Sequence, residues 1–297
     1  MLVERRPESV AALGEVLWDI FPNSIRLGGA PLNFGVHVRR LGHPVYLVSA
    51  VGSDNRGRQA AKEIEALDLD TTFLETSAEL PTGTATVELS AERTSFTIHR
   101  PAAYDGMQLA GTVERLKDKN PDWLYFGTLF ASMPEGRVFL DCLLDELDEA
   151  VKFYDLNLRS DADSPELVKH LLGRADVVKL NEEELSRVHE FCNLPSSIEG
   201  FCRGGAARYA WRAVAVTLGA RGCALLADEK YVEERGRPVE VADTVGAGDA
   251  FAAAFMHGLS LNRPLRDVAT FANRVGALVA SRHGAIPDWT LEEAVHF

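Results

Sequence analysis

The stretch that decides the fold reads Asp243-Thr244-Val245-Gly246-Ala247-Gly248-Asp249-Ala250-Phe251, and small apolar residues follow it up to Leu259. Its glycines permit a turn whose backbone N–H groups converge on one negative charge, and the next helix N-terminus adds partial positive charge. The segment predicts an anion-binding turn, Gly246 to Gly248, that stabilises a transferring phosphoryl group, with Asp249 as general base. An ordinary strand-to-helix turn with Asp249 as N-cap is the alternative.

Composition narrows the class of protein and its partners. The chain of 297 residues carries 31 basic and 44 acidic side chains, a formal net charge of −13. Lys and Arg do not cluster with interleaved aromatic residues, so nucleic acid is not an expected partner. A nucleotide still is, because a small anion responds to local amides and a few cations. The length fits one large α/β domain over residues 1–297 with an appendage.

Cysteine spacing and hydropathy predict the compartment. The cysteines, Cys142, Cys192, Cys202 and Cys223, lie far apart, which favours reduced buried thiols over a zinc site or a disulfide framework. The opening segment lacks the apolar core of an export signal, and no apolar stretch reaches the roughly 18 residues that span a bilayer. We therefore expect a cytoplasmic protein without a membrane partner.

Apolar β-type runs alternate with amphipathic helical segments through most of the chain. This alternation predicts a doubly wound, mostly parallel sheet with helices on both faces. The strand candidates are 45–51, 123–126, 151–156, 176–180 and 213–218, and the helix candidates are 55–67, 135–147 and 165–172.

One part of the chain breaks this pattern. Residues 82–89 and 95–100 are short, β-branched and alternating, and the polar turn Ser90-Ala91-Glu92-Arg93 joins them. They predict an antiparallel hairpin, which in a doubly wound fold can project over the strand ends where ligands bind. With a further strand in 18–27, the insertion at 71–105 is expected to form a small β-sheet lid.

A second glycine-rich motif, Gly28-Gly29-Ala30-Pro31-Leu32-Asn33-Phe34-Gly35, precedes a helical stretch. Adjacent glycines allow close approach of a ligand to the backbone, and the Asn33 amide offers both a donor and an acceptor to sugar hydroxyls. Asp19 follows the apolar run 11–18, where its carboxylate could accept hydrogen bonds from a polyol. Taken singly, both features are equally compatible with structural turns.

Together these motifs resemble those of the PfkB (ribokinase-like) carbohydrate kinases over nearly the whole chain. The pattern Gly28-Gly29, Asn33, Gly42 and Gly52 matches the N-terminal signature of that family, and 243–254 matches its C-terminal signature. One departure is Gly35, where the family more often has Ser, Thr or Ala. The resemblance implies a ribokinase-like α/β fold with a β-sheet lid, sugar and ATP as ligands, Mg²⁺ as cofactor, and a homodimer formed through the lid.

The resemblance also implies roles for individual residues. Asp249 matches the catalytic base, with Gly246, Ala247 and Gly248 as the anion hole. Asp19, Gly29 and Asn33 match positions that hold sugar hydroxyls. In the matching Asn-x-x-Glu motif, Asn181 lies near the phosphates and Glu184 organises magnesium-bound water. Positions matching the nucleotide site are Lys179, Asn181, Thr217, Gly219, Gly222 and Asn273. Positions where many relatives bind a monovalent cation such as K⁺, mostly through backbone carbonyls, are Asp243, Val245, Arg282 and Gly284.

The substrate is the feature that the sequence determines least. The segment 155–159 matches fructokinase-like and 2-keto-3-deoxygluconate kinase-like relatives, and if Arg159 and Arg100 converge they would bind the carboxylate of a sugar acid. The segments 14–19 and 27–34 are most similar to fructokinases, so fructose is the first expectation. A sugar acid, a sugar phosphate, a nucleoside and a catalytically silent sensor are the alternatives. A dinucleotide-binding dehydrogenase is disfavoured, because no GxGxxG follows the first strand.

Overall fold

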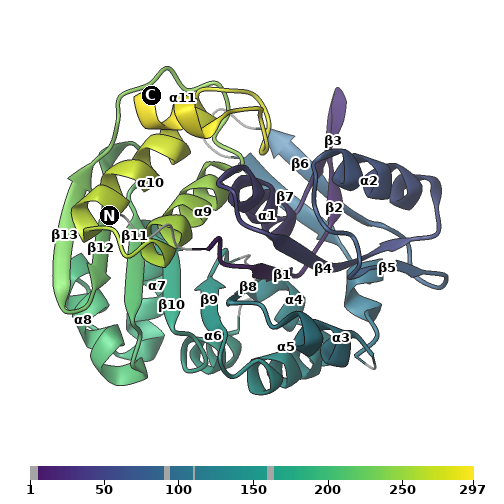
Figure 1. Cartoon of the computed structure of the whole chain (residues 1–297), viewed down its shortest axis with the longest axis horizontal. Coiled ribbons are helices and arrows are strands. Elements are labelled where there is room, and N and C mark those ends of the chain that lie inside the picture. Colours follow the sequence, from purple (N-terminus) through teal and green to yellow (C-terminus); the bar gives the residue numbers. More distant parts are fainter. Residues whose placement is uncertain (1–5, 90–93, 110, 159–163) are drawn as a thin grey trace.

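A nine-stranded sheet runs through the molecule, and a four-stranded sheet stands beside it (Figure 1). The computed structural model describes residues 6–89, 94–109, 111–158 and 164–297. The order of the large sheet is β13-β12-β11-β10-β9-β8-β1-β4-β5. Neighbouring strands are parallel, except that β12 is antiparallel to both β11 and β13. These strands are β1 Val10–Leu13, β4 Val45–Gly52, β5 Leu74–Ser77, β8 Trp123–Gly127, β9 Val151–Asp155, β10 Val177–Asn181, β11 Ala213–Thr217, β12 Gly222–Ala227 and β13 Lys230–Arg235.

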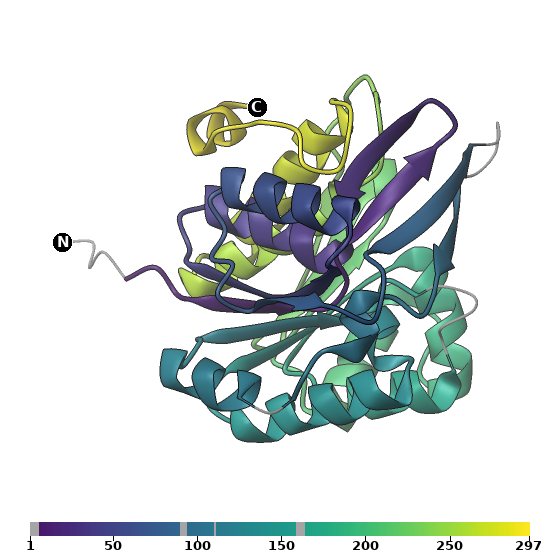
Figure 2. The same cartoon turned by 90° about the vertical axis from the view of Figure 1, so that its right-hand side faces the viewer.

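Helices cover both faces of the large sheet, and Figure 2 shows the resulting layers. Along β1, Val10 and Ala12 join one apolar cluster while Ala11 and Leu13 join the other, so both faces of the strand are buried. The predicted doubly wound α/β architecture is confirmed. One face carries α1 Ala30–Arg40, α2 Asn55–Ala66, α9 Ala247–Ser260, α10 Leu265–Ala280 and α11 Leu291–His296; the other carries α3 Thr112–Lys119, α4 Thr128–Ala131, α5 Pro134–Glu146, α6 Pro165–Leu172, α7 Glu182–Cys192 and α8 Ile198–Tyr209. Within the described residues, no helix combines the length and apolar character needed to cross a membrane.

The small sheet consists of segments that the sequence assigned to a lid. Its strands, in the order β3-β2-β6-β7, are β3 Ser24–Gly28, β2 Leu17–Phe21, β6 Gly83–Leu89 and β7 Thr94–His99. The predicted hairpin is present as β6 and β7, which pair antiparallel, while its turn at 90–93 lies outside the described residues. Figure 2 shows this sheet standing out from the layered body. One part of the expected lid differs: β5 pairs with β4 and so belongs to the large sheet.

The path of the chain through the large sheet fixes where a ligand can bind. From β1 the chain adds β4 and β5 on one side, and then crosses to β8 on the other side. Connections that leave in opposite directions open a crevice at the carboxyl ends of the strands. Side chains directly after β1, β8, β9 and β10 therefore meet at one place.

A buried histidine ties α1 to the C-terminal segment. The Nε2 of His37 lies 3.0 Å from the carbonyl oxygen of Ala285, and the indole N–H of Trp289 donates to its Nδ1 at 3.1 Å. The indole can only donate and the carbonyl can only accept, so the ring is neutral with its proton on Nε2. Burial lowers the pKa of His37 to about 3. The His37 ring therefore holds Ala285 in position, and the backbone of Ala285 lies against the turn at Gly246.

We expect His37 to make the protein less stable in acid. Its folded pKa of about 3 lies below the ordinary 6.5, so between these values the unfolded chain binds a proton that the folded chain does not. The free energy of unfolding then falls with falling pH by about 1.4 kcal/mol per pH unit from this residue. Urea unfolding of native protein and His37→Gln across this range should give a shallower slope for the variant; equal slopes would contradict the assignment.

Candidate active site

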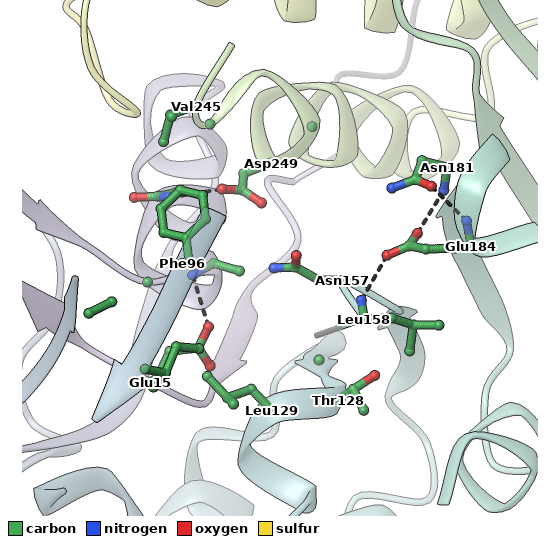
Figure 3. A pocket seen from close by; sticks show the side chains of 18 of the residues that line it. Glu15, Phe96, Thr128, Leu129, Asn157, Leu158, Asn181, Glu184, Val245 and Asp249 are labelled. Carbon is green, nitrogen blue, oxygen red and sulfur yellow. Dashed lines mark hydrogen bonds between the residues drawn. The ribbon is translucent and has the colours of Figure 1, made fainter. Parts of the chain in front are cut away.

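A cleft of about 480 Å³ opens at the carboxyl ends of the strands, beneath the small sheet. Both glycine-rich motifs, the ends of β8 to β11 and the lid strands β2, β6 and β7 contribute to its walls (Figure 3). The structure thus brings together residues that are far apart in the sequence. Its lining residues include Glu15, Asp19, Gly29, Asn33, Phe96, Thr128, Asn157, Lys179, Asn181, Glu184, Thr217, Val245, Gly246, Gly248 and Asp249.

The turn before α9 has no room for a side chain at its first glycine. Gly246 has a φ of 79°, and a Cβ there would lie 2.3 Å from the carbonyl oxygen of Ala285. Gly246 is the N-cap of α9, which places Asp249 in the first helical turn, so the alternative that made Asp249 the N-cap is wrong. Gly248 lines the cleft, whereas Ala247 donates its N–H to the carbonyl oxygen of Thr244 at 3.3 Å. A helix start of this kind favours an anion.

Asn33 connects the two glycine-rich motifs. Its Nδ2 donates to Oδ2 of Asp249 at 2.9 Å, which orients the carboxylate. Its Oδ1 is buried and has no hydrogen-bond partner among the described residues. Leaving a buried acceptor unsatisfied costs free energy. Since Asn33 lines the cleft, this oxygen is suited to accept a hydrogen bond from a hydroxyl group of a ligand.

The double glycine makes room for two carboxylate-bearing residues. A Cβ at Gly28 would lie 2.6 Å from Oδ2 of Asp19, and one at Gly29 would lie 2.3 Å from the carbonyl oxygen of Glu15. The side chain of Glu15 also accepts a hydrogen bond from the N–H of Ala30 at 3.1 Å. The glycines therefore let β2 and the segment after β1 pack closely around the cleft, which Asp19 and Glu15 both line.

Asn181 and Glu184 hold each other at the start of α7. Oδ1 of Asn181 accepts from the N–H of Glu184 at 2.8 Å, and Oε2 of Glu184 accepts from the N–H of Asn181 at 2.7 Å, a reciprocal capping box. The other Glu184 oxygen accepts from the N–H of Leu158 at 2.8 Å (Figure 3). Burial raises the pKa of Glu184, and the nearby Lys179 ammonium opposes this shift. Both predicted phosphate-side residues therefore have fixed positions on the cleft wall.

Lys179 brings a positive charge to the same wall. Its Nζ lies 2.9 and 3.1 Å from the two carboxylate oxygens of Asp155, and the Tyr125 hydroxyl donates to Asp155 at 3.2 Å. Burial alone would lower the pKa of Lys179, but the carboxylates of Asp155, Glu184 and Asp249 outweigh it and hold this pKa above its ordinary value. Lys179 is therefore an ammonium, and it is the basic side chain among the described residues that line the cleft.

Several lining residues were not predicted from the sequence, although each has a sequence feature that could have indicated its place in the cleft. Phe96 and Ile98 alternate along β7 and both face the cleft. Thr128 and Asn157 follow the ends of β8 and β9, where parallel sheets bind ligands, and Asn157 points into the space between Asp249 and Glu184 (Figure 3). Glu15 is a charged residue within a buried apolar stretch.

Arg100, one of the two arginines that would bind a sugar acid if they converged, is already paired within the protein. The guanidinium of Arg100 binds Asp105, with Nε 3.1 Å from each carboxylate oxygen, and its Nη1 donates to the carbonyl oxygen of Leu129 at 3.0 Å. Its charge is therefore already matched, and it is not among the described residues that line the cleft. Arg159 lies outside the described residues, so its expected role stays a prediction.

The residues expected at the nucleotide divide into two groups. Thr217 lines the cleft, as Lys179 and Asn181 do. Gly219 and Gly222 shape the turn after β11, both with positive φ, and Asn273 on α10 donates to the carbonyl oxygens of residues 234 and 235 at 3.3 Å each. Asn273 therefore fixes β13 to α10, and its contact with a nucleotide stays a prediction.

Three of the four positions expected at a monovalent cation meet around the carboxylate of Asp243. Its Oδ1 accepts from the N–H of Val245 at 3.1 Å, and its Oδ2 accepts from the N–H of Gly284 at 3.0 Å and from Nη1 of Arg26 at 2.9 Å. The Arg282 side chain instead turns toward the C-terminal segment. The cation itself stays a prediction.

Comparisons with known proteins agree with this geometry. The model of the pfkB family of carbohydrate kinases matches residues 11–291, and the chain belongs to this family. The fructokinase of Salmonella typhimurium is 31% identical over an alignment that covers 93% of this chain and 94% of that protein. The fructokinase of Vibrio cholerae O395, solved with fructose, ADP and calcium ion, is similar with a TM-score of 0.83 and 26% identity over 98% of both chains. The 2-dehydro-3-deoxygluconokinase of Thermotoga maritima has a TM-score of 0.87 at 19% identity over 97% of this chain and 98% of that one, and so shares the fold. The expected enzyme class, a carbohydrate kinase, and the expected ribokinase-like fold are confirmed.

The unsatisfied oxygen of Asn33 leads to a prediction for this sugar kinase. We expect Asn33→Ala to raise the KM for the sugar roughly 10- to 100-fold, because a substrate hydroxyl loses its acceptor, and to lower kcat as Asp249 loses its orienting N–H. The KM for ATP should stay near the native value. Steady-state kinetics with each substrate varied test this, with Asn55→Ala at an exposed helical position as the control. An unchanged sugar KM would contradict the role of Asn33.

Proposed function

We propose that this sugar kinase transfers the γ-phosphoryl group of ATP to a primary hydroxyl of a neutral hexose, with fructose as the first candidate. The observation that carries the proposal is the side chain of Asn33, which orients Asp249 with its N–H while its buried Oδ1 has no partner among the described residues. A polyol has neighbouring hydroxyl groups. One hydroxyl can donate a hydrogen bond to Oδ1 of Asn33, and the next can give its proton to Asp249.

The chain's own residues divide the chemistry between them. Asp249 accepts the proton of the attacking hydroxyl, and its position in the first turn of α9 keeps its carboxylate beside the N–H groups of that turn. Gly246 and Gly248 present backbone N–H groups to the phosphoryl oxygens as negative charge develops. Asp19 and the lid residues Phe96 and Ile98 enclose the sugar, which excludes water as a competing acceptor.

The donor set on the phosphate side fits a hydrated Mg²⁺. This ion prefers oxygen ligands and usually keeps several of its waters, and each Glu184 oxygen retains a lone pair beyond the N–H bond that it accepts. We propose that Glu184 would hold Mg²⁺ through its bound water, with Asn181 beside the phosphates, and that the ion would neutralise charge on the phosphates. We also propose K⁺ near Asp243, since a double mutant of the Vibrio cholerae fructokinase has been solved with fructose, ADP and potassium ion.

The charges of the cleft favour a neutral sugar over a sugar acid. At the sugar end the wall carries the carboxylates of Glu15, Asp19 and Asp249. Arg100 is bound to Asp105, and Lys179 lies beside the anion-binding turn, where the phosphoryl group is expected. Among the described residues, a substrate carboxylate would meet mostly like charge here, which is destabilising in a site of low dielectric. A sugar-acid kinase is therefore the second candidate, supported by the fold shared with 2-dehydro-3-deoxygluconokinase.

We also propose a compartment and an oligomeric state for the enzyme. We propose that residues 1–297 act as one unit in the cytoplasm, and that two copies associate through the lid. Within the described residues the small sheet has β3 and β7 as its edge strands, and unpaired strand edges are able to pair with another chain.

The first test replaces the proposed base. We expect Asp249→Asn to lower kcat by ~10²–10⁴-fold, because the amide cannot take up the proton. Binding of ATP, measured by calorimetry, should persist. Asp267→Asn is the matched control, since it removes the same charge from the exposed first turn of α10 and should leave kcat unchanged. Near-native turnover of Asp249→Asn would refute the assigned role.

The second test identifies the sugar. ADP release from Mg-ATP is measured with fructose, other hexoses, ribose, 2-keto-3-deoxygluconate, fructose 6-phosphate and nucleosides, for native enzyme and Asp249→Asn. We expect the strongest stimulation with fructose and its loss in the variant. A preference for 2-keto-3-deoxygluconate would establish the sugar-acid alternative. Binding without turnover for every compound would favour a silent sensor.

A further inference from the structure

Asp155 is buried next to the cleft, and its carboxylate contacts the lining residue Lys179. The two residues are register partners on the neighbouring parallel strands β9 and β10. Asp155 has no exposed surface, and it is not among the described lining residues, whereas Lys179 is 7% exposed and lines the cleft. Both oxygens of Asp155 lie within 3.1 Å of the same Nζ. The carboxylate therefore holds the ammonium from the protein side.

Stability alone does not account for this pair. Removing two charges from water costs several kcal/mol per ion, and apolar replacements of a buried ion pair are often neutral or stabilising. The pair is also held rigidly, because Tyr125 donates to Asp155 and its ring stacks on Phe34 with centroids 3.7 Å apart. Phe34 directly follows Asn33, so this support is continuous with the residue that orients the base.

Besides Asp155, two other carboxylates lie near enough to Lys179 to attract its ammonium. Its Nζ lies 3.3 Å from the position that a Cβ on Gly248 would take, so the ammonium sits beside the anion-binding turn. The charged groups that act on it are Asp155 on β9, Glu184 on α7 and Asp249 on α9. A lysine side chain is flexible, and without Asp155 its ammonium would move to one of the other two carboxylates. Pairing with Asp249 would occupy the base.

We propose that Asp155 is a positioning residue for phosphoryl transfer, which holds the Lys179 ammonium beside the anion-binding turn and away from the carboxylate of Asp249. This inference rests on the kinase function proposed above. A cation that is already in place stabilises charge on the phosphoryl oxygens without reorganisation during the reaction. Asp249 meanwhile keeps its capacity to accept the proton of the sugar.

Asp155→Asn tests the proposal, because it removes the charge, keeps the size and still accepts the hydrogen bond of Tyr125. We expect kcat to fall roughly 10- to 100-fold while the sugar KM stays within about threefold of the native value. The control is Glu146→Gln, which removes the carboxylate from the exposed pair of Lys117 and Glu146 and should leave both constants unchanged. A kcat of Asp155→Asn within about threefold of native would overturn the proposal.

A double-mutant cycle separates positioning from a general structural effect. In the Lys179→Met background, Asp155→Asn should cause no further loss of kcat, because no ammonium remains to be positioned. An equal loss in both backgrounds would show that Asp155 supports the fold rather than Lys179, and would overturn the proposal. Thermal unfolding of each variant identifies any that does not fold. If Asp155→Asn does not fold, Tyr125→Phe, which leaves both charges in place, replaces it in the same cycle. Tyr125→Phe should cause a smaller loss of kcat in the native background and no loss in the Lys179→Met background.

Calorimetric titration with Mg-ATP in the absence of sugar keeps this test independent of the substrate. Asp155→Asn should weaken ATP binding in the native background and not in Lys179→Met, whichever sugar the enzyme uses. If native enzyme is inactive with every sugar, the proposed function fails, and the ATP cycle alone decides the role of Asp155. If native enzyme is active and both cycles are additive, only the role of Asp155 fails.

Discussion

The turn before α9 can form only because residue 246 carries no side chain, and the cleft is arranged around that turn. Gly246 packs directly on the backbone of Ala285, and Ala285 is held in turn by the ring of His37. The direction of the first N–H groups of α9 is thus set by α1 and the C-terminal segment, two parts of the chain far apart in sequence. Preorganised dipoles of this kind stabilise developing charge without first having to move.

Several negative charges lie close together around the same turn. Asp249 and Glu184 both lie near a place where phosphate oxygens are expected, and like charges at short range repel strongly in a site of low dielectric. Backbone N–H groups donate to Glu184, the amide of Asn33 donates to Asp249, and the Lys179 ammonium interacts electrostatically with both carboxylates. Each carboxylate is stabilised before a ligand arrives, which leaves the ligand to satisfy the remaining oxygen of Asn33.

Much of the fold and part of the site could be predicted from the sequence, and the division has a physical reason. Glycines at positions of positive φ, alternating apolar runs and a hairpin of β-branched residues are local features, so the turn at Gly246, the parallel sheet and β6 with β7 were foreseen. Pairing between distant residues is not local. The bond of Lys179 with Asp155 and the place of β5 in the large sheet emerge only when the chain is folded.

The lid and the anion-binding turn are coupled through one carboxylate. Asp243, which leads into the turn, accepts hydrogen bonds from the N–H groups of Val245 and Gly284 and from Arg26 on the lid strand β3. The side chain of Arg26 is 40% exposed, so its ion pair contributes at most about 1 kcal/mol. A contact of that strength biases the lid toward the turn without locking it there. A sugar bound as proposed, in contact with Phe96 on the lid and Asp249 beyond the turn, would add to the same bias, so closure over the substrate and alignment of the N–H groups would favour each other.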